Sequence, residues 1–371
     1  MKTVGIRLEI RELNIPFKQS FKHNSAERSK TQSVIVLASE GEFKGYGESC
    51  PREYVTNESV QSVFQFFTEV KDDLLSHVDS LESLQQYHNK HKSIIDKSPS
   101  AWCAIELALL DLFAKKEHCS IEKLLGIPEL GDSFFYSAVI GDGSFETFEK
   151  VALQYLQMGF KDFKIKISGV PELDFPKFEL LKKLGGDDCK IRLDANNLWT
   201  DAAEVVSYLK KIPAQLSGLE EPLSGKDLSQ LKSLANQINV PLILDESFSL
   251  IEQIPDLISH HQSFIINLRI SKMGGLINSI AIAKQANKEE IGLIIGAQVG
   301  ETSILTRAAL SIASLTNGRY RAMEGAFGTF LLEHDIVENP LMLGKGGELK
   351  PRKLLSGGAG FQLDVREYLM H

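Results

Sequence analysis

Three acidic residues in the middle of the chain stand at the ends of apolar, β-rich runs. Asp194 follows IRL in IRLDANN, Glu220 lies in SGLEEP, and Asp245 follows LIL in LILDES. An acid at a strand end often only caps the next helix, but this explanation is weak for three acids on consecutive strands. Converging carboxylates repel one another unless a hard cation neutralises them, and oxygen ligands suit Mg²⁺. The array predicts one Mg²⁺ site in the chain.

Two lysines alternate with apolar residues in the run FKIKI. Lys164 and Lys166 therefore share one face of a strand, and the apolar residues share the other. If the apolar face meets helices, both lysines point away from them into the protein interior. Burial or a neighbouring cation lowers the pKa of an ammonium group, so such a lysine can act as a general base near neutral pH. The alternative is a half-exposed strand whose lysines face solvent.

The acids and the lysines together suggest one reaction. A carboxylate bound to Mg²⁺ has an acidified α-hydrogen, and the metal stabilises the resulting enediolate. A lysine on a neighbouring strand can remove that proton. We therefore predict a Mg²⁺-dependent enzyme that abstracts the α-proton of a small carboxylic acid.

Residues 129–335 contain the repeating elements that would position these side chains. Apolar β-rich runs alternate with amphipathic helical segments at the spacing of about 25–30 residues expected of βα units. A doubly wound sheet is the alternative, but no Gly-rich phosphate fingerprint follows the first strand. We predict the α/β class and a (β/α)-barrel (a modified TIM barrel), with chemistry at the C-terminal strand ends. The eight runs, of which the last is the least regular, are FFYSAVI, FKDFKIKI, KIRLDAN, LSGLEEP, PLILDES, FIINLRI, GLIIGAQ and RAMEGAFG.

The remaining parts of the chain flank the barrel. Residues 1–128 show three strand-like runs, GIRLEIREL, SVIVLASE and GEFKGYGES, followed by helical patterns, which predicts an α+β capping domain. These helical patterns cover about 58–77, 81–91 and 101–116. Residues 336–371 are rich in Gly and end in FQLDVREYL, a predicted strand or short helix that returns to the capping domain.

Composition narrows the class of protein and the partners. The formal net charge of −8 argues against a nucleic-acid or anionic-membrane partner. No apolar run is long enough to span a bilayer, and the N-terminus lacks the pattern of a signal peptide. The four cysteines are scattered without a CxxC pair, which favours a reduced, cytoplasmic protein. We also expect a homo-oligomer of unspecified size, as is frequent for such folds.

The ordered motifs KIK, LDAN, LEEP, LDES and INLRISKMGG resemble the enolase superfamily, and within it the muconate-lactonizing (muconate cycloisomerase-like) subgroup. The resemblance covers essentially the whole chain, with the α+β domain capping the barrel mouth. It implies that Asp194, Glu220 and Asp245 bind Mg²⁺, that Lys166 is the base, and that Lys164 lowers the pKa of Lys166. Loops at 21–28 and 52–56 would close over the substrate. Expected substrate-binding residues are Asn196, Lys272, Glu301, Arg52 and Tyr54, although Arg52 and Tyr54 would look similar in an ordinary surface loop.

One departure from the subgroup bears on the reaction. The subgroup usually has a second catalytic lysine at the end of the sixth strand, two residues after an asparagine, and here Arg269 follows Asn267 at that spacing. Arginine is always protonated and is a poor base, but it can pair with a carboxylate or stabilise negative charge. Lys272 lies three residues further on, and in a continued strand it would face the opposite side. We therefore expect a catalytic role for Arg269 other than that of a base.

Two-base racemisation or epimerisation needs an acid and a base on opposite faces of the α-carbon. Because arginine stands at position 269, where the second base is expected, we favour a lyase (dehydratase) or cycloisomerase that uses Lys166 alone. The alternatives are an epimerase or racemase of dipeptides or N-acyl amino acids, and a non-catalytic barrel that binds metal and carboxylate. A histidine base is disfavoured because none lies in LIIGAQVG.

Overall fold

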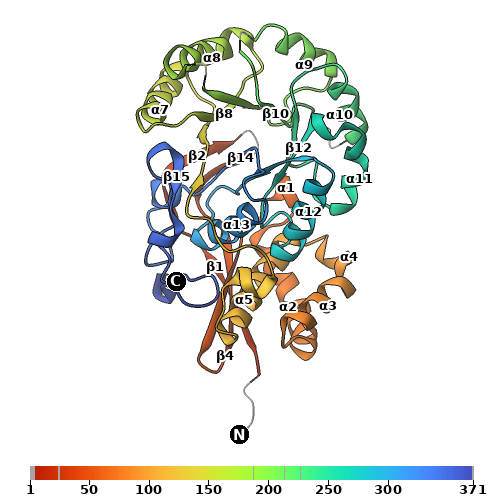
Figure 1. The fold of residues 1–371 in the computed structure, drawn as a ribbon, viewed down its shortest axis with the longest axis vertical. Helices are drawn as coiled ribbons and strands as arrows, with labels where there is room; N and C mark the ends of the chain where they lie inside the picture. Colours follow the sequence, from red (N-terminus) through yellow and green to blue (C-terminus); the bar gives the residue numbers. More distant parts are fainter. Residues whose placement is uncertain (1–4, 24–25, 187, 213, 226, 370–371) are drawn as a thin grey trace.

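The computed structural model describes residues 5–23, 26–186, 188–212, 214–225 and 227–369, and for residues 20–23 and 26–27 it describes the backbone only. Eight parallel strands form one sheet in sequential order, from the first strand to the last (Figure 1). Ser137 N, next to the first strand, donates to Met323 O of the last at 2.8 Å, which brings the two sheet ends together. The predicted (β/α)-barrel is confirmed. The strands are β7 (Ala138–Ile140), β8 (Asp162–Lys166), β9 (Lys190–Asp194), β10 (Gly218–Glu220), β11 (Leu242–Leu244), β12 (Phe264–Leu268), β13 (Gly292–Ile295) and β14 (Ala322–Met323).

The barrel helices follow strands β7 to β13 and surround the sheet in Figure 1. Short 3-10 turns, η1 (Ile251–Gln253) and η2 (Ile258–Ser263), flank α11. Strand β14 is followed by the 3-10 turn η3 (Gly328–Phe330), where a regular unit would have a helix. This irregularity is the reason that the eighth repeat is weak in the sequence. The helices are α7 (Phe145–Gln157), α8 (Pro171–Gly185), α9 (Ala202–Leu209), α10 (Leu228–Ala235), α11 (Ile254–Leu257), α12 (Leu276–Lys288) and α13 (Ser303–Leu315).

The capping domain is a three-stranded antiparallel sheet with helices packed against it. The elements are β1 (Arg7–Leu13), β4 (Ser33–Glu40), β5 (Phe43–Ser49), α1 (Glu53–Thr56), α2 (Val60–His77), α3 (Leu81–Lys90), α4 (Lys92–Ile95), α5 (Pro99–Lys116) and α6 (Ile121–Leu125). Two glycines of the third strand, β5, allow the buried helix α5 to lie directly on it. A Cβ at Gly47 would lie 2.0 Å from Ala104 O, and a Cβ at Gly45 would lie 2.1 Å from Ala108 O.

A second hairpin, β2 (Pro16–His23) with β3 (Ala26–Lys30), was not predicted. Its sequence is mostly polar and lacks the strict alternation of a half-buried strand, so pairing and contact with the barrel define it. Lys18 N, for example, donates to Leu331 O at 2.8 Å. The predicted loop at 21–28 falls on this hairpin, and its residues 24 and 25 lie outside the described residues.

The cap meets the barrel at the C-terminal ends of the barrel strands. Cys50 N at the end of β5 donates to Ser271 Oγ beyond β12 at 2.9 Å. Thr302 N at the start of α13 donates to Glu48 Oε1 of β5, also at 2.9 Å. The cap therefore covers the barrel end where active-site chemistry is expected.

The C-terminal segment lies against the cap, as Figure 1 shows. Phe361 N donates to Asp111 Oδ1 at 2.7 Å, and Lys44 Nζ lies 2.6 Å from Glu367 Oε1. The run FQLDVREYL forms an isolated bridge at Val365 and the 3-10 turn η6 (Glu367–Leu369), and upstream β15 (Glu348–Leu349) pairs with β6 (Phe134–Phe135). We propose the division into 1–128, 129–335 and 336–371.

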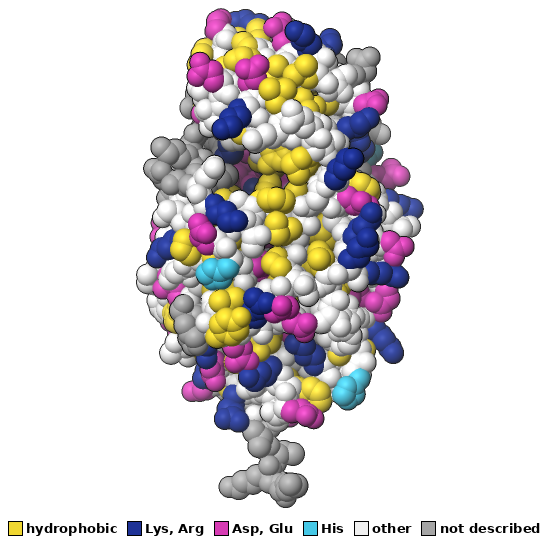
Figure 2. Space-filling view, turned by 90° about the vertical axis from the view of Figure 1, so that its left-hand side faces the viewer, with side chains coloured by type: hydrophobic (Ala, Val, Ile, Leu, Met, Phe, Trp, Pro, Cys, Tyr) yellow, Lys and Arg dark blue, Asp and Glu magenta, His cyan; other side chains and the backbone are white. Residues whose placement is uncertain are grey.

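The molecular surface carries both charged and apolar side chains. On the face in Figure 2, apolar side chains form a band along the long axis, with charged side chains gathered mainly on either side. Among the described residues, no helix combines the length and apolar character needed to cross a membrane. The homo-oligomer stays a prediction.

A fully buried ion pair joins the cap to the barrel. Arg307 of α13 donates from Nη1 and Nη2 to the two carboxylate oxygens of Glu122 in α6, each at 2.8 Å, and Ser311 Oγ adds a third bond at 2.6 Å. We expect Glu122→Ala or Arg307→Met to lower the free energy of unfolding by about 3–5 kcal/mol, because each leaves one buried charge unpaired.

Denaturant unfolding followed by circular dichroism measures this loss. The double variant should recover much of it, and Asp188→Asn, which removes the exposed Lys161–Asp188 pair, should leave the midpoint unchanged. Single variants that unfold at the wild-type midpoint would contradict the prediction.

Candidate active site

Strand β8 directs its two lysines into the barrel. Phe163 and Ile165, which alternate with them, are completely buried in the apolar core. Lys164 and Lys166 are also buried, at 4% and 7% exposed, so the solvated-lysine alternative is wrong for both. The pleat of a single strand therefore places two ammonium groups inside the barrel.

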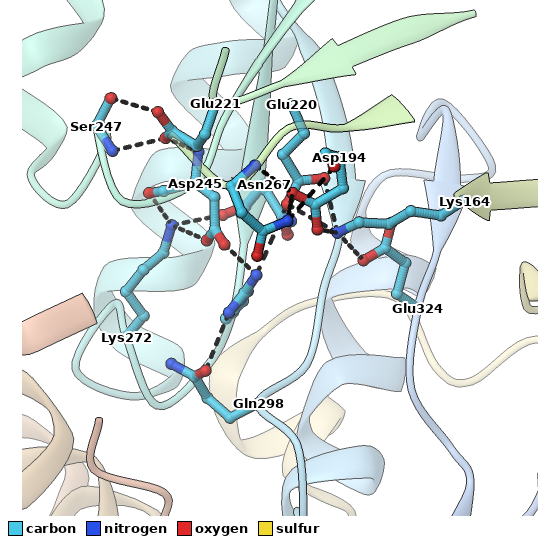
Figure 3. Close-up of polar contacts among 12 residues, drawn as sticks. Lys164, Asp194, Glu220, Glu221, Asp245, Ser247, Asn267, Lys272, Gln298 and Glu324 are labelled. Atoms are coloured by element: carbon cyan, nitrogen blue, oxygen red, sulfur yellow. Dashed lines mark hydrogen bonds and ion pairs between the residues drawn. The ribbon is translucent and has the colours of Figure 1, made fainter. Parts of the chain in front are cut away.

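Lys164 is surrounded by carboxylates (Figure 3). Its Nζ lies 2.7 Å from Glu220 Oε2, 3.1 Å from Glu324 Oε2 and 3.4 Å from Asp194 Oδ2. Burial alone would lower the pKa of Lys164, but these three anions outweigh it and raise the pKa. Lys164 is therefore a permanent cation and unsuited to act as a base.

Lys166 has a different environment. Its Nζ lies 3.1 Å from Asn196 Oδ1, and Asn196 N donates to Asp194 Oδ1 at 3.1 Å. Burial lowers the pKa of Lys166, and the positive charges of Lys164 and Arg269 act in the same direction, against the opposing effect of Asp194. Of the two lysines, Lys166 is the one suited to accept a proton.

The three strand-end acids line one side of the interior, with cations between them (Figure 3). Asp194 and Glu220 are register neighbours on β9 and β10, and Asp245 follows β11 directly. Lys164 joins the first two acids, whereas Arg269 pairs with Asp245 and lies 3.7 Å from Glu220 Oε1. Burial raises the pKa of Glu220 well above its usual range. For Asp245, the positive charges of Arg269 and Lys272 outweigh burial and lower the pKa.

The donor chemistry of these acids suits a hard divalent cation. As the side chains stand, no three metal-binding groups among the described residues are arranged to hold an ion, since the heads of Lys164 and Arg269 lie between the carboxylates. Glu220 Oε2 is buried and accepts no hydrogen bond from the described residues, although Lys164 Nζ lies close to it. Three buried oxygen donors fit Mg²⁺ if the Arg269 head moves away from Asp245.

The chain beyond β12 corrects one expectation from the sequence. The strand ends at Leu268 and the following residues form a turn, so the argument from strand alternation does not apply to Lys272. Lys272 is fully buried, and its Nζ lies 3.1 Å from Asp245 Oδ1, 2.6 Å from Asp245 O and 2.8 Å from Asn267 O. These contacts place Lys272 behind Asp245, where it holds a carboxylate.

Arg269 lies across the interior from Lys166. Its Nη1 donates to Gln298 Oε1 at 3.0 Å and its Nη2 to Asp245. Gly296 makes room for Asn267 and Arg269, because a Cβ there would lie 2.0 Å from Asn267 Oδ1 and 3.0 Å from Arg269 Cγ. The surrounding carboxylates outweigh burial and raise the pKa of Arg269, so this side chain stays charged.

The other predicted substrate-binding residues differ in where they lie. Glu301, in the loop between β13 and α13, accepts from Gln298 N at 2.6 Å and is half-buried beside the site. Arg52 is 1% exposed and donates to the backbone carbonyls of Pro51, at 2.6 Å, and Thr31, at 3.1 Å. Arg52 thus braces the cap loop.

The segment 52–56, expected to be a loop, is mostly the short helix α1, and Tyr54 of this helix is half-buried. The guanidinium of Arg28 in β3 lies 5.8 Å from the centre of its ring, and Tyr54 influences the pKa of Arg269. The two cap segments therefore meet near the Arg269 side of the barrel.

Sequence reasoning missed several residues of the site. Glu324 follows β14 and pairs with Lys164 and with Arg192, at 3.3 Å from Arg192 Nη1. It stands at a strand end in RAMEGAFG, so the rule used for the other acids could have found it. Glu221 accepts from Asp245 N at 2.6 Å and Ser247 N at 2.8 Å, which fixes the loop after β11. No local signal marks Gln298 as a partner of Arg269.

The fold and the site define a class of α/β-barrel proteins in which an α+β domain caps an acid-lined barrel end. Residues 147–367 match the family model described as "Enolase C-terminal domain-like", and residues 1–126 match "Mandelate racemase / muconate lactonizing enzyme, N-terminal domain". The chain therefore belongs to the enolase superfamily, in its mandelate racemase/muconate lactonizing enzyme family. The muconate-lactonizing subgroup stays a prediction.

Two relatives span most of the chain. A hydrophobic dipeptide epimerase from Enterococcus faecalis is 25% identical over 95% of this chain and 98% of its own. An N-succinyl-L-Arg/Lys racemase from Bacillus cereus is 24% identical over 84% of each chain.

The solved structures of similar proteins share the fold. The crystal structure of the N-succinyl Arg/Lys racemase from B. cereus has a TM-score of 0.84 and 21% identity, covering 99% of this chain and 97% of its own. A dipeptide epimerase from E. faecalis, complexed with Mg and the dipeptide L-Leu-L-Tyr, has a TM-score of 0.83 and 23% identity, covering 98% and 100%.

Proposed function

We propose that this protein is a Mg²⁺-dependent epimerase or racemase that removes the α-proton of a dipeptide or an N-acyl amino acid. The observation that carries the proposal is the buried pair on β8, where Lys164 is a fixed cation and Lys166 has a lowered pKa beside the strand-end acids. Burying two lysines next to three carboxylates has an evident use only if one of them exchanges a proton. This argues against a barrel that binds without turnover.

The proposal assigns a role to each group. Asp194, Glu220 and Asp245 would hold Mg²⁺, which would withdraw negative charge from the substrate carboxylate and so acidify the α-carbon. Lys166 Nζ takes the α-proton. Asn196, 3.1 Å from that nitrogen, orients it, and Lys164 disfavours its ammonium form.

The relatives change the preferred reaction class. The sequence alone favoured a lyase or cycloisomerase because Arg269 replaces a base, but the two relatives are named an epimerase and a racemase of amino-acid derivatives. Their similarity supports an isomerase acting on a small amino-acid derivative. Elimination or cycloisomerisation stays the second candidate, and the charged Arg269 favours it.

Solvent-deuterium exchange separates these candidates. The Mg²⁺-loaded enzyme is incubated in D₂O with a library of dipeptides, N-succinyl amino acids and other carboxylic acids, and the products are followed by NMR and chiral chromatography. Deuterium at the α-carbon with inversion supports the proposal. Loss of a β-leaving group or ring closure supports the second candidate, and no reaction with any library member contradicts both.

The pH dependence tests the assignment of Lys166. Because the neutral amine is the active form, the rate of deuterium exchange at the α-carbon that Lys166 deprotonates should rise with pH and level off below the usual lysine pKa of about 10.4. Lys164→Met should move this rise to higher pH, since removing a nearby positive charge raises the pKa of Lys166, whereas Lys164→Arg should leave it in place. An identical profile in wild type and Lys164→Met would contradict the assignment.

A further inference from the structure

The barrel topology places Lys166 and Arg269 on opposite walls. Lys166 ends β8 and Arg269 follows β12, with β9, β10 and β11 between them in one direction. In the other direction lie β13, β14 and β7, with the contact between Ser137 and Met323 completing the circuit. A substrate α-carbon between these walls has one face toward Lys166 and the other toward β12 and β13.

Arg269 cannot supply the proton that inversion requires on the second face. The surrounding carboxylates raise its pKa further, and a guanidinium does not lose its proton in proteins. Lys272 Nζ is enclosed by Asp245 and the carbonyl of Asn267. If the enzyme inverts its substrate, another group on this wall must transfer protons.

Glu301 is a titratable side chain on this wall, in the loop between β13 and α13. Its Oε1 accepts from Gln298 N at 2.6 Å. The side chain is half-buried, so it is not sealed into the core.

The loop that carries Glu301 is held firmly between cap and barrel. Gly300 has φ +91, and a Cβ there would lie 2.9 Å from Phe17 Cζ of the cap. Gly296, at the start of the loop, donates its N–H to Leu268 O of β12 at 2.8 Å. Glu301 is thus fixed next to Arg269.

The charges around Glu301 keep both of its protonation states accessible. Burial raises its pKa to about 7, and the positive charges of Arg269 and Arg52 oppose a larger rise. Besides burial, the charge of Glu301 in turn raises the pKa of Glu48 of β5 and of Cys50, Cys103 and Tyr136. A carboxyl group of this kind can donate or accept a proton near neutral pH.

We propose that Glu301 is the second acid–base group of the reaction and exchanges a proton with the substrate α-carbon on the face opposite Lys166. This inference rests on the proposed epimerase or racemase function. A second acid–base group at Glu301 would allow inversion even though Arg269 replaces the subgroup's second catalytic lysine.

The proton balance closes for one turnover. Lys166 Nζ forms an N–H bond as the α C–H bond breaks, and the electron pair moves into the enediolate of the substrate. The Glu301 O–H bond then breaks, its proton forms a new C–H bond on the opposite face, and the enediolate electrons return to that bond. Water takes the proton from Lys166 and restores the one on Glu301. For the other epimer the two groups exchange roles.

The test uses the full-length Mg²⁺-loaded enzyme, with each epimer of a substrate found in the library screen, in D₂O. Glu301→Gln keeps an acceptor for Gln298 N but transfers no proton. In this variant we expect the rate of inversion to fall by about 10²–10⁴-fold. Deuterium should still enter the α-carbon of the epimer whose α-hydrogen faces Lys166, but not that of the other epimer. Lys166→Ala should show the opposite asymmetry, and Glu301→Asp should recover part of the inversion.

Two further measurements separate a chemical from a structural role. Infrared difference titration should show a carboxyl band with a midpoint near neutral pH that is missing in Glu301→Gln, and Glu333→Gln, at an exposed site, should match wild type in both assays. Unchanged inversion in Glu301→Gln, or equal loss of exchange from both epimers, would overturn the assignment of Glu301 alone. If wild type inverts no library member, the proposed function fails and the inference fails with it.

Discussion

Lys166→Ala should abolish measurable inversion, with a loss of about 10²–10⁴-fold in kcat, the usual contribution of a positioned general base. The side chain is buried at 7% exposed, and its Nζ lies 3.1 Å from Asn196 Oδ1 inside the barrel. Water that replaces it would be a weaker and less well positioned base. Chiral analysis of product with a substrate from the deuterium screen measures the effect.

A matched control shows that the loss is chemical. Lys161→Ala removes an exposed lysine just before the same strand and should leave kcat unchanged. Circular dichroism and binding of Mg²⁺ should be close to wild type in both variants. If Lys166→Ala turned over the true substrate at the wild-type rate, Lys166 would not be the base.

Removal of the metal should have an effect of similar size. A bound divalent cation stabilises developing negative charge by several kcal/mol, and each 1.36 kcal/mol is a tenfold change in rate. We expect chelation of Mg²⁺ to lower turnover by more than about 10³-fold, with recovery on addition of Mg²⁺. Saturating Mg²⁺ should also stabilise the folded protein, by about 2.7 kcal/mol at 100 times Kd.

Two acids that both contact Lys164 provide a matched pair for locating this metal. Glu220 lies between the other two proposed ligands, whereas Glu324 pairs with Lys164 and Arg192 on the other side. Glu220→Gln should remove the thermal stabilisation by Mg²⁺, and Glu324→Gln should keep it. The reverse result, or equal retention in both variants, would place the metal elsewhere.

Much of the barrel could be predicted because its signals are local. Side chains alternate along each strand, and a βα unit must complete one strand and one helix before the next begins. These constraints give the eight runs and place Asp194, Glu220 and Asp245 at strand ends. The β2–β3 hairpin was missed since its polar run has no such periodicity.

The sequence alone thus determined the two lysines of FKIKI and the acids of LDAN, LEEP and LDES, as residue types at fixed places on neighbouring strands. Only the tertiary structure decided which charges meet. It put Lys164 among three carboxylates, Lys272 behind Asp245, and Arg269 beside Gln298 and the loop of Glu301. Arg52 likewise proved to be a buried brace of the cap. The physical reason is that strand periodicity fixes the direction of a side chain, whereas its partners depend on closure of the sheet and on docking of the cap, which join residues far apart in the chain.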